Sequence, residues 1–325
     1  MRSLRRLVTC VLAVACAGVF AQAPGTPPRI AFVAAAHEPA VAERVKAFRN
    51  GLRQLGYVEG RTIVVDYRYA DERVDRLPAM LAEIVRSRAD VIVSAGPAVT
   101  RVARQATKTI PIVMAFDTDP VGSGAVASLA RPGANVTGLS LQATDLAGKQ
   151  VELLKELVPG LARVGVIVNS HEPGNAASTQ AALAALSRLG LQAETFDVTA
   201  PEAIEPAFAQ ATRRKVDALL VLSSPQVVFH RVRFTDLAAK HRLPAIYPYT
   251  DLVEAGGLAM YGVSIDDLFR RSATFVDRIL KGARPGDLPV EQPTTFELVV
   301  NAGAARRIGL AIPPAVLARA DRVIP

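Results

Sequence analysis

RIAFVAAAHEP (29–39) returns 134 residues later in the same chain as RVGVIVNSHEP (163–173). Each copy starts with a short apolar run, which is typical of a strand buried in a parallel sheet. Each copy ends in His-Glu-Pro, a polar segment at the point where the predicted strand stops. A unit that occurs twice, with other matches at nearly the same spacing, indicates two halves of one topology within a single chain.

Three further pairs of segments repeat in the same order, at offsets between about 128 and 134 residues. The pairs are LRQLGY (52–57) with LSRLGL (186–191), ADVIVSAGP (89–97) with VDALLVLSSP (216–225), and IPIVMAF (110–116) with LPAIYPY (243–249). Apolar residues at helical spacing separate the strands of the first half, as in 40–57. Alternating strands and helices predict two Rossmann-like α/β/α lobes, each with a parallel sheet covered by helices on both faces.

The chain continues beyond the second half with a strand at 256–263, a helix at 267–282, a strand at 294–301 and a last helix within 313–324. A chain that has completed two domains and then adds such elements must return across the junction between them. Several crossings predict a hinge rather than a loose linker.

The first residues are built like a secretory signal peptide: a basic MRSLRRL, 13 apolar residues at 8–20, and the small residues AQA. We expect the signal peptide to be 1–21, with cleavage after Ala21, or alternatively after Ala23, and export to the periplasm. A lipoprotein acylated at Cys16 is the alternative. Cleavage removes three arginines, which lowers the net charge from +8 to +5, and it removes both cysteines. Disulfides and thiolate chemistry are thereby excluded, and the charge does not predict nucleic-acid binding.

Ligands bind beyond the carboxyl ends of parallel strands, so the candidate ligand-binding residues are those that follow each predicted strand. In the first half they are His37, Ser94, Gly96, Pro97, Ala98, Asp117, Thr118 and Asp119. In the second half they are Asn169, Glu172, Asn175, Ser223, Ser224, Tyr247 and Tyr249, joined by Tyr261 from the strand at 256–263.

The residue types at these strand ends are suited to small-molecule binding. Gly96 and Pro97 open a predicted helix, whose free N–H groups attract a carboxylate, although an ordinary strand–helix turn has the same sequence. Asp117 and Asp119 could hold an ammonium group, act as a carboxylate pair, or cap the following turn. Tyr247 could stack on a planar ligand or pack in the core, as could the other two tyrosines.

Motifs for catalysis and for cofactors are weak or missing. The two His-Glu pairs could meet as a metal site, but no clustered His spacing supports one, and we expect neither metal nor cofactor. GSGAVA (122–127) fits G-x-G-x-x-A without the strand that should directly precede it, and there is no Walker loop or G-x-S-x-G elbow. A binding protein is therefore expected. An enzyme using Asp117, Asp119 and His37, and a sensory module, are the alternatives.

Several long stretches resemble the tryptophan/tyrosine-binding-like (TrpX-like) group of ABC transporter substrate-binding proteins. They are 47–71, 109–140, 152–169, 241–263 and 279–324. The resemblance implies a type I periplasmic-binding fold, with two lobes that are joined by three crossings and close on a small solute. The implied lobes are 29–137 with 262–294, and 138–261 with 295–325. The implied partners are the solute and a membrane ABC permease, and the implied state is a monomer.

The resemblance also implies roles for single residues. Gly96 stands where relatives that bind aromatic amino acids have a Thr, whereas Thr118-Asp119, Asn169 and Glu172 match the family. A Thr-Asp-Asn-Thr stretch is replaced by 223–226, and Ser264 replaces an aspartate after Tyr-Gly-Val. Two acids that could bind an amine are thus missing. The expected solute is amino-acid-like, aromatic or another carboxylate.

Overall fold

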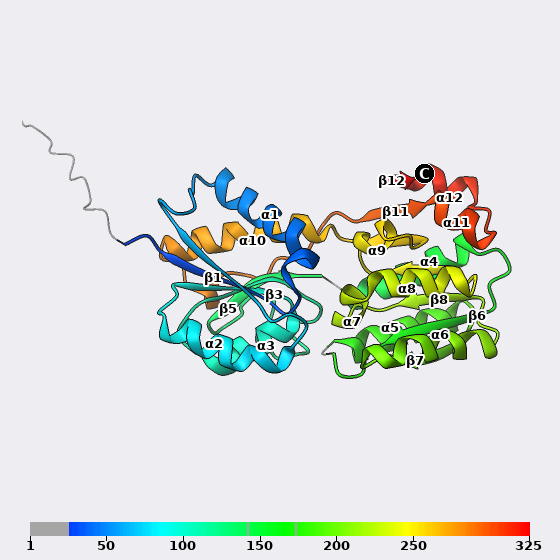
Figure 1. The fold of residues 1–325 in the computed structure, drawn as a ribbon, viewed down its shortest axis with the longest axis horizontal. Coiled ribbons are helices and arrows are strands. Elements are labelled where there is room, and N and C mark those ends of the chain that lie inside the picture. Colours follow the sequence, from blue (N-terminus) through cyan, green and yellow to red (C-terminus); the bar gives the residue numbers. More distant parts are fainter. Residues whose placement is uncertain (1–25, 142, 173) are drawn as a thin grey trace, which may run out of the picture.

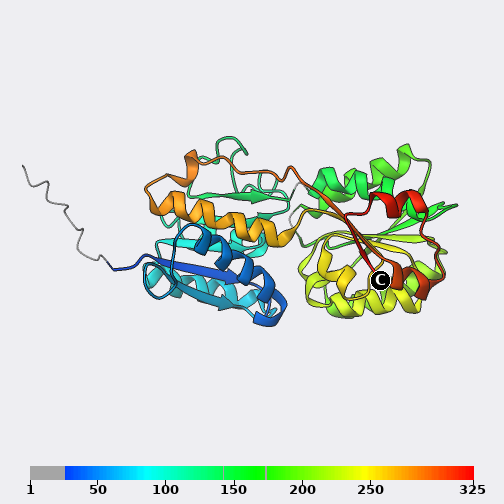
Figure 2. The ribbon, with the colours of Figure 1, turned by 90° about the horizontal axis from the view of Figure 1, so that it is seen from above.

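The computed structural model describes residues 26–141, 143–172 and 174–325. The predicted signal peptide and Cys16 lie outside the described residues. The described chain forms two α/β lobes that lie side by side along the long axis of the molecule (Figures 1 and 2). The expected fold class, with two lobes of mostly parallel sheet, is confirmed.

The first lobe contains a five-stranded parallel sheet of order β2-β1-β3-β4-β5. Its elements are β1 Arg29–Ala34, α1 Glu38–Gln54, β2 Val64–Tyr69, η1 Val74–Arg76, α2 Leu77–Arg86, β3 Val91–Ala95, α3 Pro97–Ala106, β4 Ile112–Asp117, β5 Val136–Ser140, and later α10 Ile265–Leu280 and η3 Pro285–Asp287. Helices α1 and α10 cover one face and α2 and α3 the other (Figure 1). Successive β1 side chains point to opposite faces, so Phe32 packs with α1 and α10, and Val33 packs with α2 and α3.

The second lobe contains a seven-stranded sheet of order β12-β11-β10-β9-β8-β6-β7. Its elements are α4 Ala143–Leu157, β6 Arg163–Val168, α5 Asn175–Arg188, β7 Gln192–Asp197, η2 Pro201–Ala203, α6 Ile204–Arg213, β8 Ala218–Val221, α7 Pro225–Phe229, α8 Arg231–Lys240, β9 Ala245–Tyr247, α9 Thr250–Glu254, β10 Ala259–Gly262, β11 Glu297–Asn301, α11 Ala302–Ile308, α12 Pro314–Arg319 and β12 Arg322–Ile324. Helices α4 and α5 pack on one face, and α6 and α8 on the other.

The two sheets share one strand order, since β7-β6-β8-β9-β10 repeats β2-β1-β3-β4-β5. The expectation of two halves with the same topology is therefore confirmed. The strands β1 and β6 begin 134 residues apart, as the repeated sequence indicates.

The chain passes between the lobes three times: from β5 to α4, from β10 to α10, and from the segment after η3 to β11. Strand β5 belongs to the first sheet as far as Ser140, so the chain leaves the first lobe after that residue rather than at 137. Strand β11 returns from the first lobe and therefore runs antiparallel to β10, an exception to the expected parallel pairing. The sequence analysis also did not anticipate α11 and β12.

Within the described residues, no helix combines the length and the apolar character needed to cross a membrane.

Candidate functional site

The carboxyl ends of strands from both sheets meet at the junction of the lobes and enclose a cavity of about 60 Å³. The first lobe lines it with Ala34, Ala35, Ala36, Val41, Arg44, Ala95, Gly96, Pro97, Ala98, Val99 and Phe116. The second lobe lines it with Glu172, Ser223, Ser224, Val228, Phe229 and Tyr249. This volume holds a few water molecules, so a larger solute can enter only when the lobes or their side chains move apart.

The N-terminus of α3 forms one wall of the cavity and is not capped by a side chain. Gly96 precedes it with φ +124°, a conformation that favours glycine, and a Cβ there would lie 3.3 Å from the Phe116 ring. The first N–H groups of a helix have no partner within the helix, and Pro97 at the first position has none to offer. The N–H groups of Ala98 and Val99 are therefore suited to bind an anion, helped by the helix dipole.

Ser94 was predicted to bind ligand, but the structure places it behind this wall. Its hydroxyl is fully buried, donates to the Gly96 carbonyl oxygen at 3.0 Å and lies 2.7 Å from the Thr100 hydroxyl. Thr100 donates to the same carbonyl at 3.2 Å. Ser94 thus holds the loop that presents α3, and it does not line the cavity.

Two buried carboxyl groups approach each other from opposite lobes. The pKa of Asp117, at the end of β4, is raised to about 7, mainly by burial; the charge of Asp119 adds to the rise, and the hydrogen bond from the Asp119 N–H opposes it. Burial also raises the pKa of Glu172 to about 7, with a further contribution from the charge of Asp117. Glu172 lines the cavity, whereas Asp117 lies beneath it. A cation between the lobes would relieve the unfavourable burial of both charges.

The two aspartates after β4 also cap their own turn. Asp117 accepts the N–H of Asp119 at 3.1 Å, and Asp119 accepts the N–H of Gly122 at 2.8 Å. Thr118 and Asp119 abut the second lobe at Gly174, where a Cβ would lie 2.9 Å from the Thr118 hydroxyl oxygen. Three roles were considered for Asp117 and Asp119: binding an ammonium group, acting as a carboxylate pair, and capping the turn. The hydrogen bonds show that both cap the turn.

The second lobe contributes a network of short polar side chains. The Ser223 and Tyr249 hydroxyls are hydrogen-bonded to each other, and Ser224 caps α7 by accepting the Val227 N–H at 3.4 Å. Asn175 donates to the Ser223 carbonyl at 2.7 Å and accepts the N–H of Asn169 at 3.0 Å. A second cavity of about 30 Å³ adjoins the first along Ser223 and Tyr249, and Thr118 and Asn175 also line it.

Four other predicted residues lie away from both cavities. His37 is 42% exposed, with Nδ1 3.0 Å from Glu72 Oε1, and lines an outer groove with α8. Tyr247 is fully buried in the core, and its hydroxyl has no hydrogen-bond partner among the described residues. The side chain of Tyr261 stacks on that of Phe296, with ring centroids 6.1 Å apart. Ser264 caps α10 by accepting the Asp267 N–H at 3.3 Å.

Three large side chains that were not predicted from the sequence also line the cavity: Arg44, Phe116 and Phe229. Arg44 had a detectable signal, because it lies three residues after Val41 on the apolar face of its helix. Phe116 and Phe229 lie among apolar neighbours in the sequence, and no local pattern separates them from core residues.

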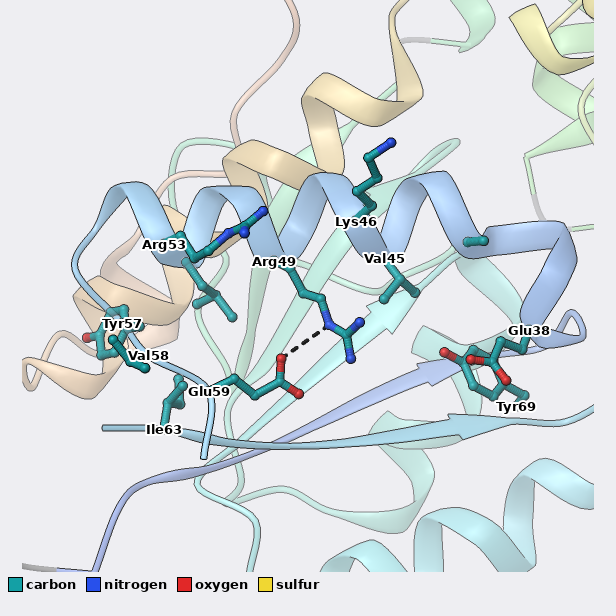
Figure 3. A pocket seen from close by; sticks show the side chains of 12 residues that line it. Glu38, Val45, Lys46, Arg49, Arg53, Tyr57, Val58, Glu59, Ile63 and Tyr69 are labelled. Carbon is teal, nitrogen blue, oxygen red and sulfur yellow. Dashed lines mark ion pairs between the residues drawn. The ribbon is translucent and has the colours of Figure 1, made fainter. Parts of the chain in front are cut away.

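A larger groove, of about 760 Å³, lies elsewhere, on the outer side of the first lobe between α1 and β2 (Figure 3). Arg49, Glu59 and Tyr69 are among its lining residues. It does not bring the two lobes together, so we assign the site to the smaller cavity at the strand ends. GSGAVA (122–127) lies in turns with no helix after it, and the described chain has no cluster of three metal-ligating side chains.

Comparison with known proteins shows the family to which this two-lobed chain belongs. The sequence matches the family "ABC transporter substrate binding protein" over residues 29–324. The chain belongs to this family. Its members are solute-binding proteins of transporters, not enzymes, and they act in the periplasm or outside the cell. The expectation of a non-enzymatic receptor of an ABC importer is confirmed.

Individual relatives are similar over most of their length. The chain is 26% identical over 263 residues to the tyrosine-binding protein of Clostridioides difficile (strain R20291), covering 81% of this chain and 75% of that protein. The ABC domain of Streptococcus pneumoniae in complex with L-Trp superposes with a TM-score of 0.86 at 29% identity, covering 92% of this chain and all of that one. A conserved domain protein of Vibrio cholerae has the same TM-score, identity and coverage.

Proposed function

We propose that the solute of this receptor is a small aromatic molecule with a carboxylate, and in first place an aromatic amino acid. The main support for this proposal is the uncapped N-terminus of α3 at Gly96–Val99, which lies at a largely apolar cavity between the lobes. Helix N-termini bind anions through free N–H groups and the helix dipole. A carboxylate at this position would lie at the end of β3, where ligands of open parallel sheets bind.

The other walls suit an aromatic body and an amine. Phe116 from the first lobe and Phe229 from the second supply apolar surface on both sides of the cavity. Glu172 is the acid that lines it, and an ammonium group beside Glu172 would also offset the charge of Asp117. With Glu172 as the partner of the ammonium group, the site would not need the two acids of the family pattern that the sequence lacks at 223–226 and at Ser264. The relatives that bind tyrosine and L-Trp agree with such a solute.

Binding and closure are coupled in this arrangement. The carboxylate site belongs to the first lobe and Glu172 to the second, so the solute gains both sets of contacts only when the lobes are together. A ligand shifts a conformational equilibrium by its difference in affinity for the two states. We infer that the solute enters the open form and that the closed form, as a monomer in the periplasm, delivers it to a membrane permease.

A set of three probes tests the solute class: L-tryptophan, indole-3-propionate, which lacks the amine, and L-tryptophanamide, which lacks the carboxylate. We expect L-tryptophan to bind most tightly by calorimetry, and each deletion to weaken binding by about 1–3 kcal/mol, as for a lost charged hydrogen bond. Binding should also reduce the radius of gyration measured by X-ray scattering. Binding of L-tryptophanamide as tight as that of L-tryptophan would exclude carboxylate recognition at α3.

The variant Glu172→Gln separates the amino acid from the second candidate, an aromatic acid without an amine. If the ammonium group lies beside Glu172, the variant should lose affinity for L-tryptophan and keep its affinity for indole-3-propionate. If the natural solute is an aromatic acid, the wild-type protein should prefer indole-3-propionate.

A further inference from the structure

Arg44 joins the two lobes through protein atoms alone. It projects from α1 of the first lobe, and its Nη2 donates to Oδ2 of Asp251, on α9 of the second lobe, at 2.9 Å. The guanidinium also lies over the ring of Tyr249, 5.7 Å from the ring centroid. The Arg44 side chain is 7% exposed and that of Asp251 is 37% exposed. An arginine can pair with a carboxylate and stack on an aromatic face at the same time.

We propose that Arg44 is a closure latch: it sets the affinity of this receptor for solutes by stabilising the closed arrangement through Asp251 and Tyr249. The proposal rests on the proposed function only in taking the cleft as the place where a solute binds. When only the closed form binds tightly, the apparent dissociation constant rises as the closed fraction falls. A contact that is made between the lobes and lost on opening therefore changes affinity without touching the solute.

The charges around the latch favour this role. Burial raises the pKa of Asp266, on α10 of the first lobe, and the charges of Asp251, Glu43 and Glu254 raise it further, whereas the charge of Arg44 lowers it. Asp266 thus lies near charges from both lobes: Arg44 and Glu43 belong to α1 of the first lobe, and Asp251 and Glu254 belong to α9 of the second. Removing Arg44 would leave these acids to repel one another, whereas removing Asp251 would leave Arg44 other negative charges nearby.

The same helix provides a matched control. Arg49, five residues after Arg44 on α1, also pairs with a carboxylate and stacks on a tyrosine. Its Nε lies 3.2 Å from Glu59 Oε2 (Figure 3). Its guanidinium is 4.5 Å from the ring centroid of Tyr67. All three residues of this second set belong to the first lobe. Its removal can therefore affect the stability of that lobe but not the contact between lobes.

X-ray scattering of the protein with no solute added tests the latch directly. We expect Arg44→Gln to increase the radius of gyration, Asp251→Asn to increase it less, and Arg49→Gln to leave it at the wild-type value. Arg44→Lys should lie between wild type and Arg44→Gln, because lysine keeps the charge but loses the planar stacking group. Equal radii for Arg44→Gln and the wild type would overturn the proposal.

Affinity measurements separate a latch from a solute contact. Arg44→Gln should weaken L-tryptophan, indole-3-propionate and L-tryptophanamide by the same factor, roughly tenfold, mainly through faster dissociation. In a double-mutant cycle, Arg44→Gln and Asp251→Asn should be non-additive, whereas Arg49→Gln should combine additively with Asp251→Asn. A loss confined to the probes that carry a carboxylate would show that Arg44 contacts the solute, and would contradict the latch.

The failure of the latch and the failure of the proposed function have different signatures. A wild-type protein that does not bind any of the three probes contradicts the proposed solute class, while the scattering comparison still decides whether Arg44 holds the lobes together. Wild-type binding that Arg44→Gln leaves unchanged contradicts the latch alone. Urea unfolding of each variant reports whether a change in affinity reflects a loss of folded protein.

Discussion

Glu172 in the second lobe lies close enough to Asp117, at the end of β4 in the first, that the charge of Asp117 adds to burial in raising the pKa of Glu172. Both carboxyl groups are buried, and both have pKa values of about 7. The closed arrangement thus brings two acids together that are better tolerated when one or both carry a proton.

This pair predicts a pH dependence of stability with a definite sign. The pKa of Glu172 is raised above its ordinary value of 4.5, so between about pH 4.5 and 7 the folded protein binds a proton that the unfolded chain does not. The free energy of unfolding should therefore fall as the pH rises from about 4.5 to 7, by on the order of 3 kcal/mol for Glu172. Urea unfolding at several pH values measures this.

Glu172→Gln should make that pH profile less steep, with the remaining slope due to Asp117, and should make the protein more stable than the wild type at pH 8. Glu202, an exposed acid on the second lobe, provides the control, because Glu202→Gln should leave the profile unchanged. A wild-type profile that rises between pH 6 and 8, and that Glu172→Gln does not alter, would contradict the raised pKa.

Tyr247→Phe should leave solute binding unchanged and should not destabilise the protein. The Tyr247 hydroxyl is buried with no hydrogen-bond partner among the described residues, and burial of such a group costs about 1–3 kcal/mol. Removing it should raise the free energy of unfolding by up to about 1 kcal/mol, measured by thermal or urea unfolding. A large drop in stability would reveal a partner, such as a buried water.

Tyr249→Phe is the informative counterpart, since Tyr249 lines the cavity and shares a hydrogen bond with Ser223. Its removal should weaken solute binding by roughly 0.5–1.5 kcal/mol, the usual net value of one hydrogen bond. Calorimetry with L-tryptophan compares the two variants. Equal effects of Tyr247→Phe and Tyr249→Phe would mean that the cavity is misassigned.

Gly96→Ala should weaken solute binding and lower stability together. The φ of +124° strains any other residue, and the new Cβ would meet the Phe116 ring at 3.3 Å. We expect a loss of about 1–3 kcal/mol in the free energy of unfolding. Adding Phe116→Leu should relieve the contact but not the backbone strain, so the double variant should recover only part of the loss. Full recovery would show that the ring contact alone matters.

Ser94→Ala should lower stability with a smaller effect on solute affinity, because Ser94 holds the Gly96 loop from behind and does not line the cavity. The loss of its buried hydrogen bonds should cost about 1–2 kcal/mol. Urea unfolding and calorimetry on the same preparation separate the two effects. A loss of affinity much greater than the loss of stability would place Ser94 in contact with the solute.

Local sequence patterns were enough to predict the two-lobed fold, and they also predicted a candidate site at the ends of the strands. The repeat of 29–39 at 163–173 can be recognised from short stretches of sequence, because each copy contains its own apolar strand and the polar residues that end it. Gly96 and Pro97 were predicted at the cavity for the same reason: a strand that ends in a turn and opens a helix is a local pattern. Asp117 and Asp119, the acids after β4, could likewise be predicted to cap their turn, because capping depends on residues close in the sequence.

Which of the polar residues line the cavity, and which residues join the lobes, depends on tertiary contacts that no local pattern shows. Tyr247 ends β9 inside the core, and Tyr249, two residues later, lines the cavity because the chain turns between them. Arg44 is 207 residues from Asp251, and no local pattern links them. Contacts between lobes depend on how two separately folded units come together, so they are set by the three crossings and the packing around them.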